Sequence, residues 1–115
     1  MELSKGGVAM AAFLVQFSYT DKGSSGMLKD GGTKRRAAAE QAFKSVGGRL
    51  VAYYFAFGDY DGIALVDGLD NTNIAAVNLA IAATGAVRTY TTVLLTPEEV
   101  DAATKKTVNY SPPGR

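Results

Sequence analysis

The 115-residue sequence contains neither cysteine nor histidine. The lack of cysteine excludes disulfides, thiolate zinc sites and cysteine nucleophiles. The lack of histidine excludes Ser-His-Asp catalysis, histidine-ligated haem and the imidazole sets that usually bind zinc or iron. Chemistry in this chain would have to use carboxylates, phenols, hydroxyls or basic side chains. We therefore predict no resident cofactor and no metal site.

Charge of one sign and long apolar runs are also missing. The net charge is +1, with 20% charged and 47% apolar residues, which predicts a folded chain without a nucleic-acid or membrane partner. No apolar run approaches the ~20 residues of a spanning helix. The short run over residues 8–15 follows Lys5 but is not followed by a convincing cleavage site. It is better interpreted as the start of a strand, and a cytoplasmic location is expected.

The hydrophobic pattern predicts one α+β domain. Strand-like alternation, helical stripes and capping residues follow one another in the order β-α-β-β-α-β, which is typical of a ferredoxin-like antiparallel sheet with its helices on one face. A short C-terminal helix, opened by Thr96 and Pro97, completes this series. The predicted strands cover residues 11–19, 49–57, 62–67 and 87–95, and the predicted helices cover residues 33–46 and 71–84.

The remaining segments are expected to lack regular structure. Residues 20–32 contain four glycines together with Asp, Ser and Lys, so we predict a loop that is either functional or mobile. Residues 1–10 are predicted to be a flexible N-terminal extension and 109–115, with two prolines, an irregular tail. The predicted folded domain covers residues 11–108.

A Gly-Asp-rich connection joins the second and third predicted strands. It comprises Gly58-Asp59-Tyr60-Asp61 followed by Gly62, and two apolar runs flank it, which predicts a β-hairpin. We expect its glycines to supply positive φ and its aspartates to hydrogen-bond backbone amides near the turn. The functional alternative is a carboxylate-rich lip over a cleft that binds a cation or acts as a base.

The hairpin motif and several other segments resemble the GYD domain family in their order along the chain. Besides Gly58-Asp59-Tyr60-Asp61, the matching segments are Ser18 to Asp21, Gly47-Gly48, Val66-Asp67 and Gly85 to Thr92. The resemblance covers about residues 11 to 96 and implies a dimeric α+β barrel, in which two ferredoxin-like protomers place their sheets face to face. The family has no settled biochemical function.

The predicted strands carry apolar residues on both faces. A sheet with one face in water should alternate apolar with polar residues, so the second face is expected to be covered. Symmetric pairing is the commonest way to cover such a face, and we predict a homodimer. Whether these dimers assemble into a higher oligomer is left open.

Polar residues within the predicted strands suggest a small-molecule pocket between the two facing sheets. The alternative is a filled dimer core in which each tyrosine hydroxyl finds a backbone partner. Arg88 is interpreted either as a clamp for an anionic ligand or as the ion-pair partner of an aspartate. The candidate ligand-binding residues are Gln16, Ser18, Tyr54, Asp59, Tyr60, Asp61, Arg88, Tyr90 and Thr92.

Two classes of function follow from these residues. The first is a homodimeric module that binds a small ligand or serves in assembly. The second is a small cofactor-independent oxygenase or isomerase, with Tyr54, Tyr90, Asp61 and Arg88 as its acid, base and positioning groups. The enzyme hypothesis depends on analogy between folds, and a fold does not establish a function.

Overall fold

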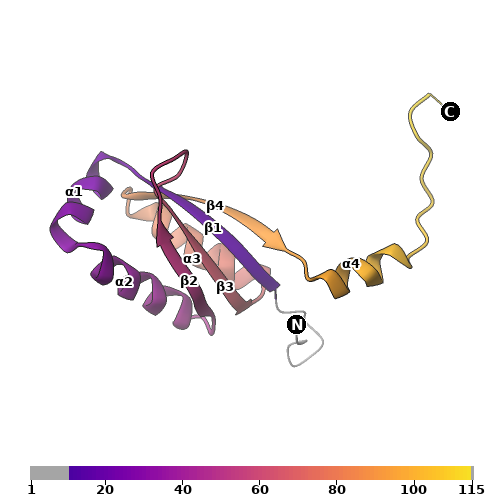
Figure 1. Cartoon of the computed structure of the whole chain (residues 1–115), viewed down its shortest axis with the longest axis horizontal. Helices are drawn as coiled ribbons and strands as arrows, with labels where there is room; N and C mark the ends of the chain where they lie inside the picture. The colour runs from indigo at the N-terminus through magenta and orange to yellow at the C-terminus, as the bar shows by residue number, and fades with distance from the viewer. Residues whose placement is uncertain (1–10, 115) are drawn as a thin grey trace.

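The computed structural model describes residues 11–114, and the predicted extension over residues 1–10 lies outside this range. Within it, the chain forms a four-stranded antiparallel sheet and four helices, which confirms the predicted ferredoxin-like α+β fold (Figure 1). The predicted boundary between the folded domain and the C-terminal tail, at residues 108 and 109, stays a prediction. The elements are β1 (Ala11–Tyr19), α1 (Asp21–Asp30), α2 (Gly32–Lys44), β2 (Arg49–Phe55), β3 (Gly62–Leu69), α3 (Asn71–Ala83), β4 (Val87–Leu94) and α4 (Pro97–Thr104).

The sheet has the strand order β2-β3-β1-β4, and each neighbouring pair is antiparallel. Residues that pair directly across strands point to the same face. One row of such pairs crosses the whole sheet, from Tyr54 through Ile63 and Gln16 to Tyr90. The register therefore decides which side chains share a surface.

Alternate residues of the central strands form the core with α2 and α3. Because successive side chains of a strand point to opposite faces, one face of the sheet meets the helices and the other stays open. The apolar residues of the helix-covered face bury together with residues of both helices. This core consists of Phe13, Val15, Phe43, Ala64, Val66, Leu69, Ile74 and Val77.

The capping signals at the starts of α3 and α4 form the expected hydrogen bonds, whereas α2 begins at Gly32 without a side-chain cap. The Asp70 carboxylate accepts a hydrogen bond from the backbone N–H of Asn73 at 2.8 Å and so caps α3. Thr96 and Glu99 form a complete capping box at the start of α4. Gly47 and Gly85, with φ of 87° and 73°, lie where the sequence predicts that α2 and α3 end.

The prediction of a loop over residues 20–32 is wrong, because most of that segment is helix α1. The Thr20 hydroxyl accepts from the backbone N–H of Gly23 at the start of this helix, and the Thr20 N–H donates to the Ala86 carbonyl at 3.0 Å. Gly23 is buried, and a Cβ there would collide with the Ala86 carbonyl oxygen. Contacts with residues far away in the chain therefore stabilise α1, although its glycines and serines have low helix propensity.

The expected role of the hairpin glycines also needs correction. Neither Gly58 nor Gly62 has a positive φ. Gly62 is buried, and a Cβ there would collide with the Phe17 ring and the Tyr54 carbonyl oxygen. Position 62 requires glycine because neighbouring atoms pack closely against it, whereas Gly58 has open space around it.

The strand ends differ slightly from prediction. Strand β2 ends at Phe55, two residues early, and β3 continues to Leu69. The β2–β3 pairing shifts register between Leu50 and Ala52, which is typical of a β-bulge. Beyond the bulge, Tyr53 faces the helices and Tyr54 faces away from them.

Candidate functional site

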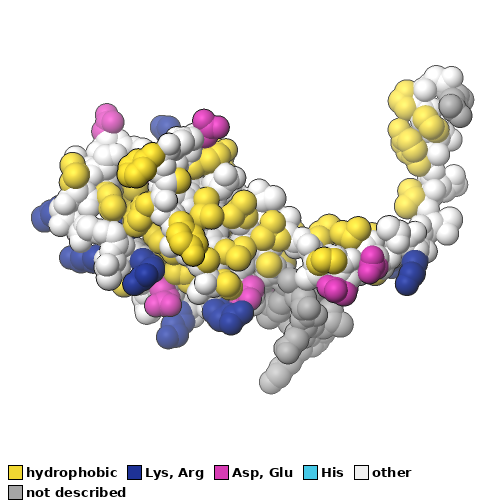
Figure 2. Space-filling view, viewed as in Figure 1, with side chains coloured by type: hydrophobic (Ala, Val, Ile, Leu, Met, Phe, Trp, Pro, Cys, Tyr) yellow, Lys and Arg dark blue, Asp and Glu magenta, His cyan; other side chains and the backbone are white. Residues whose placement is uncertain are grey.

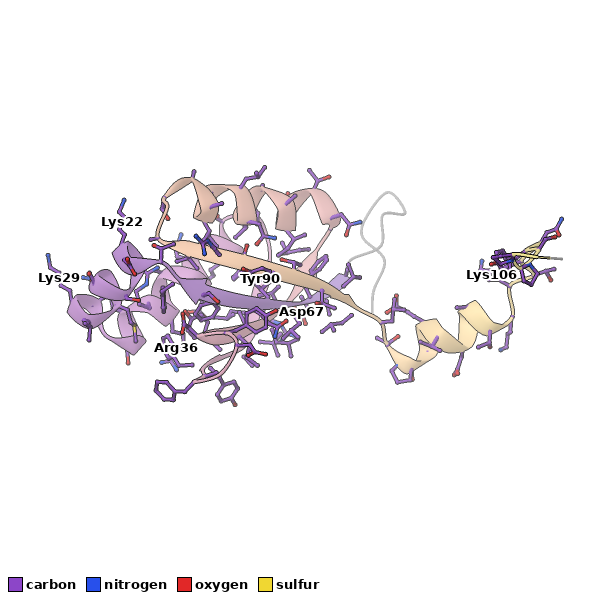
Figure 3. All side chains as sticks on the ribbon, turned by 90° about the horizontal axis from the view of Figure 1, so that it is seen from above. Lys22, Lys29, Arg36, Asp67, Tyr90 and Lys106 are labelled. Atoms are coloured by element: carbon purple, nitrogen blue, oxygen red, sulfur yellow. The ribbon has the colours of Figure 1, made fainter. Side chains whose placement is uncertain are left out.

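Six of the predicted site residues lie on the open face of the sheet. Tyr54, Gln16 and Tyr90 belong to the row that crosses the sheet, and Arg88 pairs with Ser18 across β1 and β4. Thr92 pairs with Leu14 one row further along. Figure 3 shows Tyr90 on the side of the sheet away from α3. The register between the strands thus places these six residues on a common face.

Together these residues form a surface rather than a cavity. The Tyr54 and Tyr90 side chains are 64% and 47% exposed, and the half-buried Ile63 and Leu65 lie on the same face. Figure 2 shows apolar side chains gathered over this face of the sheet. A pocket here would need a second surface opposite it.

The two hairpin aspartates have different surroundings. The Asp61 carboxylate accepts a hydrogen bond from the Tyr19 backbone N–H at 2.7 Å, and the Asp61 N–H donates to the Phe17 carbonyl at 2.8 Å. Asp61 therefore attaches the hairpin to the end of β1. Asp59 is exposed and has no hydrogen bond within residues 11–114. The Tyr60 ring meets the Tyr90 ring edge to face, with centroids 5.2 Å apart.

Arg88 is exposed on the open face, at the level of Ser18. Across the described part of the chain, its guanidinium forms no ion pair with an aspartate or glutamate. One charged pair does span the same face, between Arg49 of β2 and Asp67 of β3, with Nη2 and Oδ2 2.7 Å apart. Hydrogen bonding to Arg49 lowers the pKa of the Asp67 carboxyl.

A groove of about 360 Å³ lies on the opposite side of the sheet, between α2 and α3. Small side chains on the facing helices leave this space open, and the helix-covered face of the sheet forms its floor. Ala38, Ala39, Ala42, Ala76 and Ala80 contribute the small side chains, and Val15, Phe17, Tyr53, Ala64, Val87 and Thr89 contribute from the strands.

The lining of the groove also includes Tyr19, Tyr53 and Arg35. The Tyr53 ring stacks on Phe17, with centroids 5.3 Å apart. Burial raises the pKa of the Tyr53 phenol, the neighbouring Tyr19 adds to this rise, and Arg35 opposes it. Tyr53 is therefore a neutral phenol at physiological pH, close to a guanidinium and a second phenol.

The Arg35 guanidinium forms a long ion pair with Asp30. Its Nη1 lies 3.5 Å from Oδ2 of Asp30, and its side chain is 34% exposed. Such a long, partly hydrated contact contributes little to stability. The guanidinium is consequently available for a stronger acceptor.

Sequence reasoning did not select these three residues. Tyr53 precedes the selected Tyr54, and alternation along the strand already places the two on opposite faces. The basic segment Lys34-Arg35-Arg36 has the pattern of a solvated helix surface. The space between α2 and α3 has no signal in the sequence, since it depends on the distance between two helices.

Neither a metal-binding cluster nor a membrane-spanning helix is found among the described residues. Among residues 11–114, no group of three or more acidic side chains is placed to hold a metal ion. In the same range, no helix is both long and apolar enough to cross a membrane.

Comparison with known proteins places these features in context. The family profile of the GYD domain matches residues 13–104. The chain is also similar to the "Glutamine synthetase and cystathionine beta-lyase binding protein" of Thermus thermophilus, with 29% identity over 82 residues. That match covers 71% of this chain and 85% of the relative. No solved structure matches significantly.

Proposed function

This chain belongs to the GYD domain family, and we propose that it is a homodimeric binding module that holds a small amphipathic organic anion between α2 and α3. The groove is the observation that carries the proposal. Its volume of about 360 Å³ lies in the range of small-molecule sites, which are mostly apolar with a few polar groups. The ligand would therefore lie on the helix-covered side of one sheet and not between two sheets, where the sequence suggests a pocket.

The chemistry of the ligand follows from the lining. Alanines, valines and aromatic rings favour an apolar body, because removing such surfaces from water is favourable. Arg35 and the Tyr53 hydroxyl can donate hydrogen bonds to a carboxylate or a similar anion. The Tyr53 phenol is protonated at physiological pH, so its hydroxyl can act as a donor. An anionic head with an apolar tail satisfies both parts of the groove.

The homodimer is supported by the open face. Exposed tyrosines and half-buried aliphatic residues from four strands cover it, and a two-fold partner would offer the same surface. Burying such a face is favourable in proportion to its apolar area. In this arrangement the α2–α3 grooves lie on the outer sides of the dimer and stay accessible.

A protein partner is a second candidate function, favoured by the name of the Thermus relative. An exposed apolar surface rimmed by polar residues is typical of protein interaction sites. Co-sedimentation with a purified glutamine synthetase tests this candidate directly. A stable complex would support it, and separate sedimentation of the two proteins would count against it.

The ligand proposal is tested by calorimetric titration of the protein with laurate, with neutral methyl laurate as comparison. We expect laurate to bind and the ester to bind at least about tenfold more weakly. The Tyr53→Phe and Arg35→Gln variants should each weaken laurate binding by about tenfold, which corresponds to about 1.4 kcal/mol.

The matched control is Tyr54→Phe, which removes the same hydroxyl from the adjacent residue on the open face. It should leave laurate binding unchanged. Loss of binding in Tyr54→Phe but not in Tyr53→Phe would return the site to the space between two sheets. Equal binding of laurate and its ester would disprove recognition of the anion.

A further inference from the structure

The C-terminal arm, defined here as residues 95–114, extends away from the rest of the protein. Figure 1 shows α4 and the segment after it projecting beyond the end of β4. No residue of α4 is buried. The radius of gyration is 17.2 Å, whereas a compact chain of this length has about 13 Å. Helix α4 is therefore not buried against the part of its own protomer that the structure describes.

Helix α4 is too short to be stable in water without packing against another surface. The helix has eight residues, and isolated helices shorter than about 12 residues are marginal in water. Its capping box contributes on the order of 1 kcal/mol, which is small against the cost of ordering the segment. A helix this short normally requires a surface to pack on.

The arm carries the side chains for such packing. Leu95, Val100, Val108 and Tyr110 are between 46% and 77% exposed and recur along its length. Apolar side chains are visible on α4 and near the end of the arm in Figure 2. The family match also extends to residue 104 and so includes α4. Helix α4 thus lies within the extent matched by the family profile, although none of its residues is buried against the described part of its own chain.

We infer that the C-terminal arm packs on a second copy of this chain and extends the dimer interface of the open face. The inference rests on the homodimer of the proposed function. The arm continues directly from β4, an edge strand whose Tyr90 and Thr92 lie on that face. The arm therefore begins at the edge of the open face, with exposed apolar residues of its own. Two-fold symmetry would give two reciprocal arm contacts in each dimer.

The first test uses the full-length double variant Val100→Asp/Tyr110→Asp in sedimentation equilibrium. We expect its dimer dissociation constant to rise at least about tenfold, because both side chains would become charged in the interface. The matched control, Thr104→Asp/Ser111→Asp, adds the same charge at exposed polar positions of the arm and should dimerise normally. Circular dichroism should show both variants folded.

The outcomes separate this inference from the proposed function. A wild-type chain that sediments as a monomer would contradict the homodimer itself. A wild-type dimer with unchanged dissociation constants in both variants would overturn only the role of the arm.

A second test identifies what the arm contacts. Because the sequence has no cysteine, Val100→Cys gives a single position for a benzophenone label. Illumination should produce a covalent dimer of twice the chain mass. The control label at Ala75→Cys, an exposed position on α3, should not. Links within one chain, or no excess over the control, would overturn the inference.

Discussion

Two aspartates of the hairpin show how residues of one motif can differ in role. Asp61 accepts a hydrogen bond from the Tyr19 amide and connects the hairpin with β1, whereas Asp59 is exposed. A buried or half-buried amide that loses its acceptor costs more than an average hydrogen bond contributes. The surroundings of Asp61 therefore indicate a structural role.

We expect Asp61→Ala to lower the free energy of unfolding by about 1–3 kcal/mol, because the Tyr19 N–H would lose its acceptor. Urea unfolding monitored by circular dichroism measures this change. Asp59→Ala is the control within the same motif and should change stability by less than about 0.5 kcal/mol. Full stability in Asp61→Ala together with weaker laurate binding would instead assign Asp61 to the ligand site.

Among the elements, α3 and α4 begin with similar capping chemistry but differ in packing. Asp70 caps α3, whose Ile74 and Val77 are buried in the core. Thr96 caps α4, which has no buried residue. The stability that a cap contributes to the whole protein should thus depend on whether its helix packs on the core.

We expect Asp70→Ala to lower the free energy of unfolding by about 1 kcal/mol, because the Asn73 N–H would lose its partner at the end of a packed helix. Thermal unfolding followed at 222 nm measures the shift. Thr72→Ala, an exposed change in the first turn of the same helix, is the control and should have a much smaller effect. Equal losses in both variants would contradict a specific contribution of the Asp70 cap, because Thr72→Ala should by itself raise helix propensity.

For the whole molecule, the question is what covers the open face of the sheet. In the proposed dimer, Tyr54 meets the partner's sheet, so a charge at this position would be buried without a partner. Burying an unpaired charge is expensive enough to prevent association. The outer surface of α3 should tolerate the same change.

We expect Tyr54→Asp to convert the dimer to a folded monomer. Size-exclusion chromatography with light scattering determines the mass. Leu79→Asp is the matched control, since Leu79 of α3 is 71% exposed and Tyr54 is 64% exposed. It should remain dimeric. Dimers of equal stability in both variants would contradict the face-to-face arrangement.

Most of the fold could be predicted from the sequence, because its strongest signals are local. Alternation in residues 11–19 determines one strand, and the caps at Asp70 and Thr96 each specify a helix start through hydrogen bonds that span only a few residues. Alternation also places Arg88, Tyr90 and Thr92 on one face of β4, but only the register between strands shows that Tyr54 and Gln16 share that face.

Only the tertiary structure decided the features that depend on distant parts of the chain. Helix α1 forms in a glycine-rich segment because Ala86 lies against Thr20 and Gly23. The groove exists because α2 and α3 lie apart over the sheet, and this separation brings Arg35 and Tyr53 into one lining. Local sequence specifies hydrogen bonds within an element, whereas the space between elements depends on packing among residues far apart in the chain.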